Sequence, residues 1–167
     1  AFGLNVSAVS NIEVYGNTPG PAVSKFNANF FCGSISTGFN LTDDISTGVS
    51  IKYIYEGIYV DEANGYAFDI GVNYKTSYEG LIIAGVIRNL GSMNNLRNEA
   101  TKLPVEFRLG PAYSFGLEAS KLNFVTALEL QKYTATNDIH LNAGLEVLYD
   151  SIIAIRAGYQ SGYESRN

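Results

Sequence analysis

The alternation within residues 64–75 is the feature that most constrains how this chain can fold. Every second residue there is apolar or aromatic, from Tyr66 through Ile70 to Tyr74, and the residues between them, such as Asp69, are small, polar or charged. Successive side chains of a strand point to opposite faces, so the segment predicts a strand with one apolar and one polar face. Tyrosines at both ends of the apolar face, with aliphatic residues between them, are typical of a strand that crosses a bilayer.

The same period of two recurs along the whole chain, and no helical periodicity of comparable quality accompanies it. It predicts nine antiparallel strands, at residues 1–11, 27–41, 45–59, 65–75, 80–88, 104–116, 121–133, 137–149 and 151–160. Three of them are noisier, because residues such as Gly85 and Lys132 interrupt their apolar parity. Pro111 cannot donate a ladder hydrogen bond, so we expect a bulge or a sheet edge at that position.

The predicted connections alternate in length. Those at 12–26 and 89–103 are long, 60–64 and 134–136 are of middling length, and 42–44, 76–79, 117–120 and Asp150 are tight. Outer-membrane barrels have short turns on the periplasmic side and longer loops outside. This assignment predicts two aromatic belts on the apolar parity, with Tyr74, Phe115 and Tyr149 at one end of the strands and Tyr66 and Tyr159 at the other.

Composition narrows the classes of protein further. The 167 residues suffice for one domain, which we predict to span residues 1–167. The net charge of −5 argues against a nucleic-acid partner, which needs clustered Lys and Arg. Cys32 is the only cysteine, so no disulfide can form within the chain. No apolar stretch approaches the ~20 residues of a transmembrane helix, so a membrane-spanning form of this chain has to be a barrel.

The polar parity of the strands carries charges of both signs, at Lys52, Glu56, Asp69, Glu106, Arg108, Glu129, Glu146 and Arg156. Burying an unpaired charge in a dry interior costs roughly several kcal/mol, and this cost does not arise when the charge faces a hydrated lumen. We therefore expect ion pairs of Glu106 or Glu129 with Arg108 or Arg156. A soluble β-sandwich or barrel with the apolar side inward would give the same alternation. The expected belts, strand lengths and loop alternation favour the membrane form.

Four segments, taken in order, resemble a known family: Ile51-Lys-Tyr-Ile-Tyr55, Val86-Ile-Arg-Asn-Leu-Gly91, Leu103-Pro-Val-Glu-Phe-Arg-Leu-Gly110 and Ile155-Arg-Ala-Gly-Tyr-Gln-Ser-Gly162. Together they resemble the PorV/PorQ family of bacterial outer-membrane β-barrels, which are FadL-like. The resemblance implies a barrel of about fourteen strands and a role in type IX secretion. The sequence departs from the family at both ends, and nine strands is an odd number. We therefore expect a fragment of a longer chain that lacks the N-terminal segment and the closing C-terminal strands.

Motifs for catalysis are weak. His140 and Cys32 lie far apart in the sequence without a supporting motif, and they lack the spacing of metal ligands. Asp43-Asp44 and Asp61-Glu62 fit loose calcium sites, although turn-forming carboxylates are commoner. We therefore expect no enzyme, no cofactor and no metal. The candidate ligand- or partner-binding residues are Arg88 and Asn89 at the mouth of a long loop, together with Glu106, Arg108 and Arg156.

The predicted fold class is thus all-β, an antiparallel transmembrane β-barrel in the bacterial outer membrane, of which this chain holds about nine strands. The first functional hypothesis is a non-enzymatic component of protein secretion or surface attachment, whose long loops engage cargo proteins or secretion-system subunits. The second is a FadL-like transporter of fatty acids or other hydrophobic molecules. The third is a soluble β-sandwich or barrel that acts as a binding module.

Overall fold

The structure is a computed structural model that describes residues 1–162 except 97–98, 101, 118–119 and 137. Its strands are β1 (Phe2–Val14), β2 (Ser24–Asn40), β3 (Ile45–Ile58), β4 (Asp61–Lys75), β5 (Leu81–Met93), β6 (Asn95–Leu96), β7 (Glu99–Ala100), β8 (Glu106–Leu117), β9 (Leu122–Tyr133), β10 (Ile139–Tyr149) and β11 (Ile153–Ser161). The predicted all-β class is confirmed. No helix among the described residues is long and apolar enough to cross a membrane.

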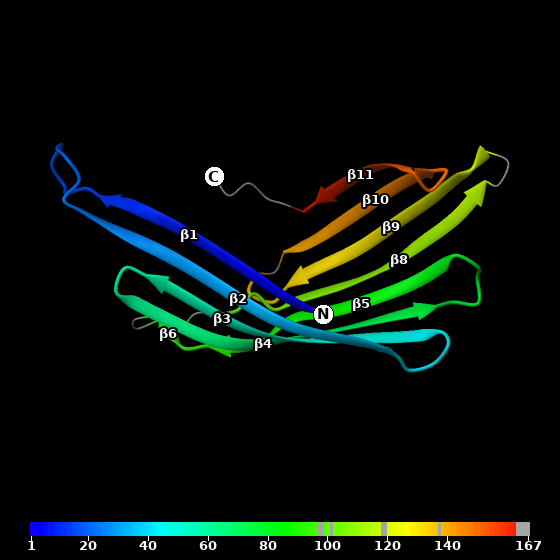
Figure 1. Cartoon of the computed structure of the whole chain (residues 1–167), viewed down its shortest axis with the longest axis horizontal. Helices are drawn as coiled ribbons and strands as arrows, with labels where there is room; N and C mark the ends of the chain where they lie inside the picture. Colours follow the sequence, from blue (N-terminus) through cyan, green and yellow to red (C-terminus); the bar gives the residue numbers. More distant parts are fainter. Residues whose placement is uncertain (97–98, 101, 118–119, 137, 163–167) are drawn as a thin grey trace. The chain divides into compact units, whose positions relative to one another are not determined.

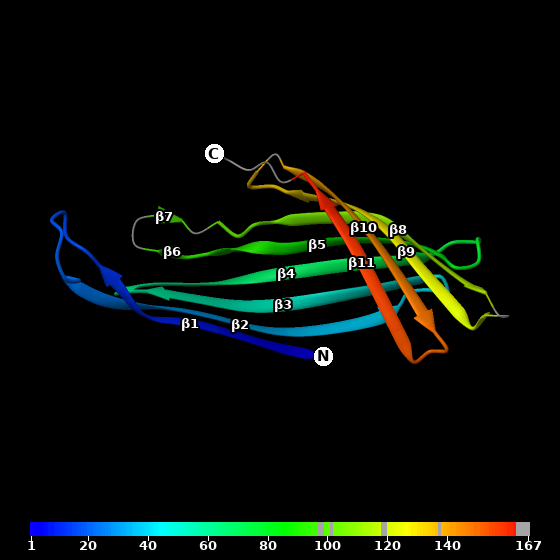
Figure 2. The ribbon, with the colours of Figure 1, turned by 90° about the horizontal axis from the view of Figure 1, so that it is seen from above.

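Nine strands form one sheet in the order β1-β2-β3-β4-β5-β8-β9-β10-β11, and β6 and β7 form a separate two-stranded sheet. Each long strand therefore pairs with its neighbour along the chain, as the ribbon shows for β8 to β11 (Figures 1 and 2). These nine strands correspond to the nine expected from the period of two. The order has two ends, β1 and β11, so the sheet is not closed within the described part of the chain. Closure into a barrel stays a prediction.

The chain divides into two compact units. Unit 1 contains Ala1–Thr37, Ser50–Phe68 and Asn89–Leu103, and unit 2 contains Gly38–Val49, Asp69–Arg88 and Pro104–Asn167. Strands β2 to β5 contribute residues to both units, whereas β8 to β11 belong wholly to unit 2. The expectation of one domain over residues 1–167 is tested neither way by this division, because the same strands run through both units.

The predicted connection 60–64 is wrong, because β4 already begins at Asp61 and leaves only Tyr59 and Val60 as a turn. The reason lies in β5, which continues to Met93 and supplies a partner for the start of β4: the Asn94 amide donates to the Asn64 carbonyl at 2.8 Å. The predicted long connection 89–103 is accordingly shorter, and it contains β6 and β7. Parts of the predicted connections 89–103 and 117–120 lie outside the described residues, at 97–98 and 101 in the first and at 118–119 in the second.

The expected bulge or edge at Pro111 is also wrong. Strand β8 lies between β5 and β9, and its register with β5 runs without a shift from Ile82–Ala112 through Ile83–Pro111 to Ala84–Gly110. On the other side, the register with β9 is the same before and after residues 110 and 111, where paired positions are absent. The missing N–H of proline therefore interrupts one ladder locally without adding a residue to the strand.

Unit 2 carries an apolar face that follows from the alternation and the antiparallel register together. Phe107 lies opposite Ile87 on β5 and Lys132 on β9, and Leu145 on β10 lies opposite Thr126 and Ala157. Leu145 is 43% exposed and Ile155 is 69% exposed. This apolar face consists of Ile70, Val72, Tyr74, Leu81, Ile83, Gly85, Ile87, Phe107, Leu109, Pro111, Tyr113, Phe115, Leu117, Leu122, Phe124, Thr126, Leu128, Leu130, Lys132, Ile139, Leu141, Ala143, Leu145, Val147, Tyr149, Ile153, Ile155, Ala157 and Tyr159.

Aromatic residues gather at one end of the apolar face of unit 2. Tyr74, Phe115 and Tyr149 each lie near the end of their strand and are at least 40% exposed. The Phe115 ring stacks on Phe124 of the facing strand, with centroids 5.0 Å apart and an interplanar angle of 9°. The Tyr113 ring stacks on Phe115 in turn, at 5.6 Å. The aromatic residues thus occupy the expected end of these strands, on the exposed apolar side.

Unit 1 repeats the alternation on β1 and β2. Their register sets Leu4 opposite Gly33 and Val6 opposite Phe31, and one extra residue of β1 shifts it between Val9 and Ile12. The buried hydrophobic residues described in the structure, Ile54, Ala63 and Ala67, all belong to this unit. None of the described residues on the apolar face of unit 2 is among them, so this face is an exposed surface and not a core.

Candidate functional site

The polar face of unit 2 brings charged side chains from four neighbouring strands together. The register sets Arg88 of β5 opposite Glu106 of β8, and Arg108 of β8 opposite Gln131 of β9. It sets Glu129 of β9 opposite Asn142 of β10 in the same way. Cross-strand partners on one face lie close enough for their side chains to interact. We call these six residues and Asp69 the polar network.

Glu106 is the centre of the polar network and is only 3% exposed. Its Oε1 lies 2.6 Å from Nη2 of Arg108, and its Oε2 lies 3.5 Å from Nη1 of Arg88. Nε2 of Gln131 donates a further hydrogen bond to Oε1, at 2.5 Å. A buried carboxylate is stable only when paired and hydrogen-bonded, and here two guanidinium groups and one amide meet that need.

The network continues from Arg108 toward β10. Nη1 of Arg108 lies 3.3 Å from Oε1 of Glu129, and Nδ2 of Asn142 donates to that same oxygen at 2.8 Å. Nδ2 of Asn142 also donates to Oε1 of Gln131 at 3.0 Å, whereas the buried Oδ1 of Asn142 has no hydrogen-bond donor in the structure. Asp69 joins from β4, with its Oδ2 at 4.0 Å from Nε of Arg88. Three carboxylates thus face two guanidinium groups.

The structure brings together three of the five predicted site residues. Arg88, Glu106 and Arg108 belong to the polar network. The expected pairing of Glu106 or Glu129 with Arg108 is confirmed, since Arg108 pairs with both carboxylates. Arg156 pairs instead with Glu146, which lies directly opposite on β10. Asn89 belongs to unit 1, where its Oδ1 accepts a hydrogen bond from Nζ of Lys52 at 2.9 Å. None of these contacts tests a role in binding.

Sequence reasoning missed Gln131 as a member of the network. It is 2% exposed and also donates to the Tyr133 hydroxyl at 2.6 Å. The available signal was its parity, since Gln131 alternates with Glu129 on β9 and shares that strand's polar face. Only the register across strands, which parity does not give, places it beside Glu106.

The contacts of the polar network link neighbouring strands and are suited to hold them in register. Each member makes at least one contact with another, across β4, β5, β8, β9 and β10. Within the ranges that the structure describes, no group of three or more His, Cys, Asp or Glu side chains is arranged to hold a metal ion.

Comparison with models of known protein families gives no match, and comparison with curated protein sequences gives no significant relative.

Proposed function

We propose that this chain forms part of the wall of a bacterial outer-membrane β-barrel of the PorV/PorQ type, which serves protein secretion or surface attachment without catalysis. The observation that carries the proposal is the pair of opposite faces on unit 2. One face exposes apolar side chains along β5, β8, β9, β10 and β11, and the other gathers the polar network.

The free energy of the exposed apolar face supports this proposal, because lipid would remove the cost of its contact with water. Exposed apolar area costs roughly 25 cal/mol per Å² in water, and this cost vanishes when lipid covers the face. Strands β8, β9 and β10 contain 12, 12 and 11 residues, which meets the requirement of about 9 to 11 residues for a tilted strand that spans a bilayer. On the other face, a hydrated interior accommodates the ion pairs of Arg88 and Arg108.

The proposal requires that the free edges of β1 and β11 pair with further strands. A sheet edge in the hydrocarbon region leaves backbone N–H and C=O groups without hydrogen-bond partners. Each such group costs roughly several kcal/mol, because lipid tails offer no hydrogen bonds. Closed barrels avoid such edges. Additional strands between β11 and β1 would complete the wall.

Partner recognition is proposed for two connections on the side with the longer loops, residues 15–23 and 94–105. Arg88 and Asn89 lie close to the second connection in sequence. Deleting 95–103 tests this while it keeps β5, which ends at Met93, and the backbone amide of Asn94 that donates to the Asn64 carbonyl. We expect the deletion to reduce cargo at the cell surface of the native host while barrel assembly persists. A matched deletion within the tight turn 76–80 of the opposite side leaves export unchanged. Unchanged export after the 95–103 deletion contradicts the role of this connection.

One observation favours a second candidate function, a FadL-like conduit for hydrophobic molecules. A hollow of about 400 Å³ involves small residues of several strands, among them Gly71, Ala84, Gly110 and Ala127, beside Val86. If fatty acids pass there, Ala127→Phe fills the hollow and reduces their uptake, and fatty acid co-purifies with the wild-type protein. An empty wild-type protein in mass spectrometry contradicts this candidate.

A further inference from the structure

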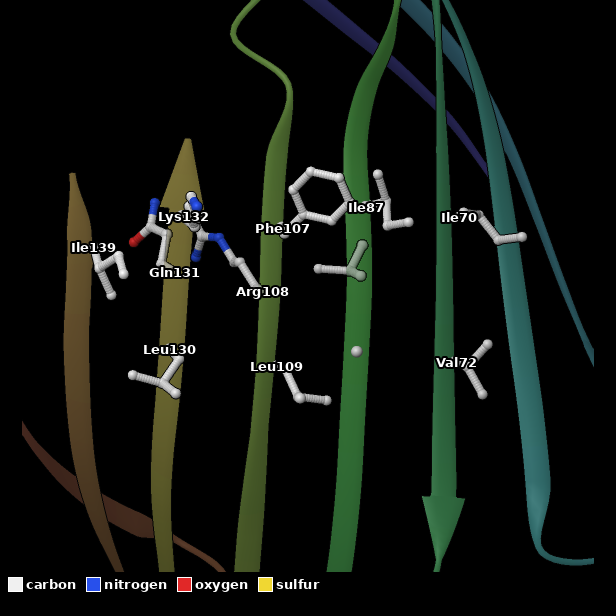
Figure 3. A pocket seen from close by; sticks show the side chains of 12 residues that line it. Ile70, Val72, Ile87, Phe107, Arg108, Leu109, Leu130, Gln131, Lys132 and Ile139 are labelled. Carbon is white, nitrogen blue, oxygen red and sulfur yellow. The ribbon is translucent and has the colours of Figure 1, made fainter. Parts of the chain in front are cut away.

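A groove lies on the apolar face of unit 2 and opens to the exterior. Its volume is about 660 Å³, within the range of roughly 300–1,000 Å³ that small-molecule sites occupy. Figure 3 shows the apolar side chains along it, which come from four neighbouring strands: Ile70, Val72, Ile87, Phe107, Leu109 and Leu130. A groove of this lining accommodates a hydrocarbon chain.

The groove exists because Gly85 interrupts the apolar face. Gly85 lies opposite Leu109 on β8, in the row next to the one that contains Ile87 and Phe107. A Cβ added at Gly85 would meet Cδ1 of Leu109 at 3.4 Å, an ordinary contact. Backbone geometry therefore does not demand glycine here, and a larger residue at this position fills the groove.

Two cationic residues contribute to the lining of this groove, Arg108 and Lys132, and the guanidinium group of Arg108 is already paired with Glu106 and Glu129. Lys132 is exposed, contributes to the groove lining and lies opposite both Phe107 and Ile139 in the register. It is the next-to-last residue of β9 and the only charged residue on the apolar face as defined above. Among the described residues its ammonium group has no ion-pair or hydrogen-bond partner. A lysine near a strand end extends its charge to the membrane–water boundary while its methylene groups cover apolar surface.

From this geometry we infer that the groove binds one acyl chain of a phosphate-bearing anionic lipid, whose phosphate contacts the ammonium group of Lys132. The inference rests on the proposed function, which surrounds this face with lipid. Charge complementarity selects the occupant. An acyl chain matches the apolar lining, and a phosphate matches the ammonium group of Lys132, because the other lining cation, Arg108, is paired with carboxylates. Attraction between one lysine and an anionic lipid surface contributes about 1 kcal/mol.

The test uses the full chain, refolded in mild detergent and titrated with phosphatidylglycerol or phosphatidylcholine. Native mass spectrometry counts the lipids that each variant retains. We expect the wild-type chain to retain one phosphatidylglycerol with a preference of about fivefold over phosphatidylcholine, which corresponds to the contribution of one charge. Lys132→Gln removes this preference, and Lys132→Arg keeps it.

Filling the groove tests the acyl-chain part of the inference. Gly85→Leu is expected to abolish retention of both lipids, and Ala157→Leu, which adds the same side chain elsewhere on the apolar face, leaves retention unchanged. Circular dichroism checks that each variant keeps its strand content. If Gly85→Leu misfolds, Gly85→Ala, whose added methyl group makes only ordinary contacts, is expected to weaken retention in the same direction.

Failure of the inference can be told apart from failure of the proposed function. If the chain inserts into bilayers but Lys132→Gln and Gly85→Leu retain lipid as the wild type does, the groove is not a lipid site and the inference is overturned. A stable dimer in the mass spectrum that Gly85→Leu abolishes overturns it too, because a second copy then occupies the groove. If the chain never enters a bilayer, the proposed function itself fails.

Discussion

Glu106 and Arg108 lie two positions apart on the same face of β8, and Nη2 of Arg108 lies 2.6 Å from Oε1 of Glu106. The period of two aligns them, and the register then adds Arg88 and Gln131 from the two neighbouring strands. A buried carboxylate thereby joins three consecutive strands of unit 2, so the polar network is expected to fix strand register.

Removal of this carboxylate should therefore destabilise the protein. Glu106→Ala leaves Arg88 and Arg108 without their shared acceptor, and we expect a loss of about 1–3 kcal/mol in the free energy of unfolding. Urea denaturation in detergent, followed by circular dichroism, measures the change. Glu146→Ala is the matched control, because it breaks a cross-strand pair whose Arg156 side chain is 72% exposed, and exposed pairs contribute about 0–1 kcal/mol. Equal losses for the two variants would contradict the central place of Glu106.

A new charge should change stability much more on the apolar face of β10 than on its polar face. Leu145 lies on the apolar face near the middle of the strand, so Leu145→Arg is expected to destabilise the membrane-inserted protein by about 2–4 kcal/mol. Gly144 lies on the other face, and an added Cβ there has no atom within 4 Å. Gly144→Arg should accordingly change stability by less than about 1 kcal/mol. Folding efficiency into lipid vesicles compares the two, and a greater loss for Gly144→Arg would reverse the assignment of faces.

Features of the fold that depend on neighbouring residues could be predicted from the sequence, and features that depend on residues far apart in the sequence could not. The nine strands and their two faces follow from a local period of two, so segments such as Ile139–Tyr149 could be predicted well. The start of β4 could not, because it depends on the extension of β5, where the Asn94 amide reaches the Asn64 carbonyl. The alternation within one segment therefore does not predict where a strand begins when its hydrogen-bond partner comes from another strand.

The candidate site shows the same division. Parity placed Glu106, Arg108 and Glu129 on the polar face, but it did not say which residues stand opposite one another. Arg156 was expected to share those partners, and the register gives it Glu146 instead. Gln131 was missed for the same reason. Register depends on turns and on the whole sheet, so it is not encoded in any single strand.

Gly110 should tolerate no side chain. Its added Cβ would come within 1.9 Å of the Leu128 carbonyl oxygen and 2.8 Å of the Glu129 Cα, so β8 and β9 would have to separate. We expect Gly110→Ala to cost about 1–3 kcal/mol in the free energy of unfolding, as overpacking does. Gly144→Ala, where the space is open, should instead be neutral or stabilising by about 0.5–1 kcal/mol. Denaturation midpoints of the two alanine variants test this, and a tolerated Gly110→Ala would contradict the close approach of the strands.

The stacked rings of Phe115 and Phe124 should be energetically coupled. Their centroids lie 5.0 Å apart and the residues are opposite one another in the register. A double-mutant cycle with leucine at each position is expected to give a coupling energy of about 0.5–1.5 kcal/mol. Phe115 and Tyr159 lie at opposite ends of the sheet and are not paired with one another in the register, so the effects of their substitutions on the free energy of unfolding should add within about 0.5 kcal/mol. Additivity of the stacked pair would show that the contact contributes nothing specific.

Cysteine labelling on β10 tests most directly whether lipid covers the apolar face while water reaches the polar one. Gly144→Cys and Leu145→Cys, each in a Cys32→Ser background, are reconstituted in lipid vesicles together with whatever strands complete the wall. A charged, water-soluble maleimide should then modify the Gly144→Cys protein rapidly and leave the Leu145→Cys protein unmodified until the bilayer is dissolved. Equal labelling of both variants, faster labelling of Leu145→Cys, or a chain that stays in buffer without associating with the vesicles would contradict the account.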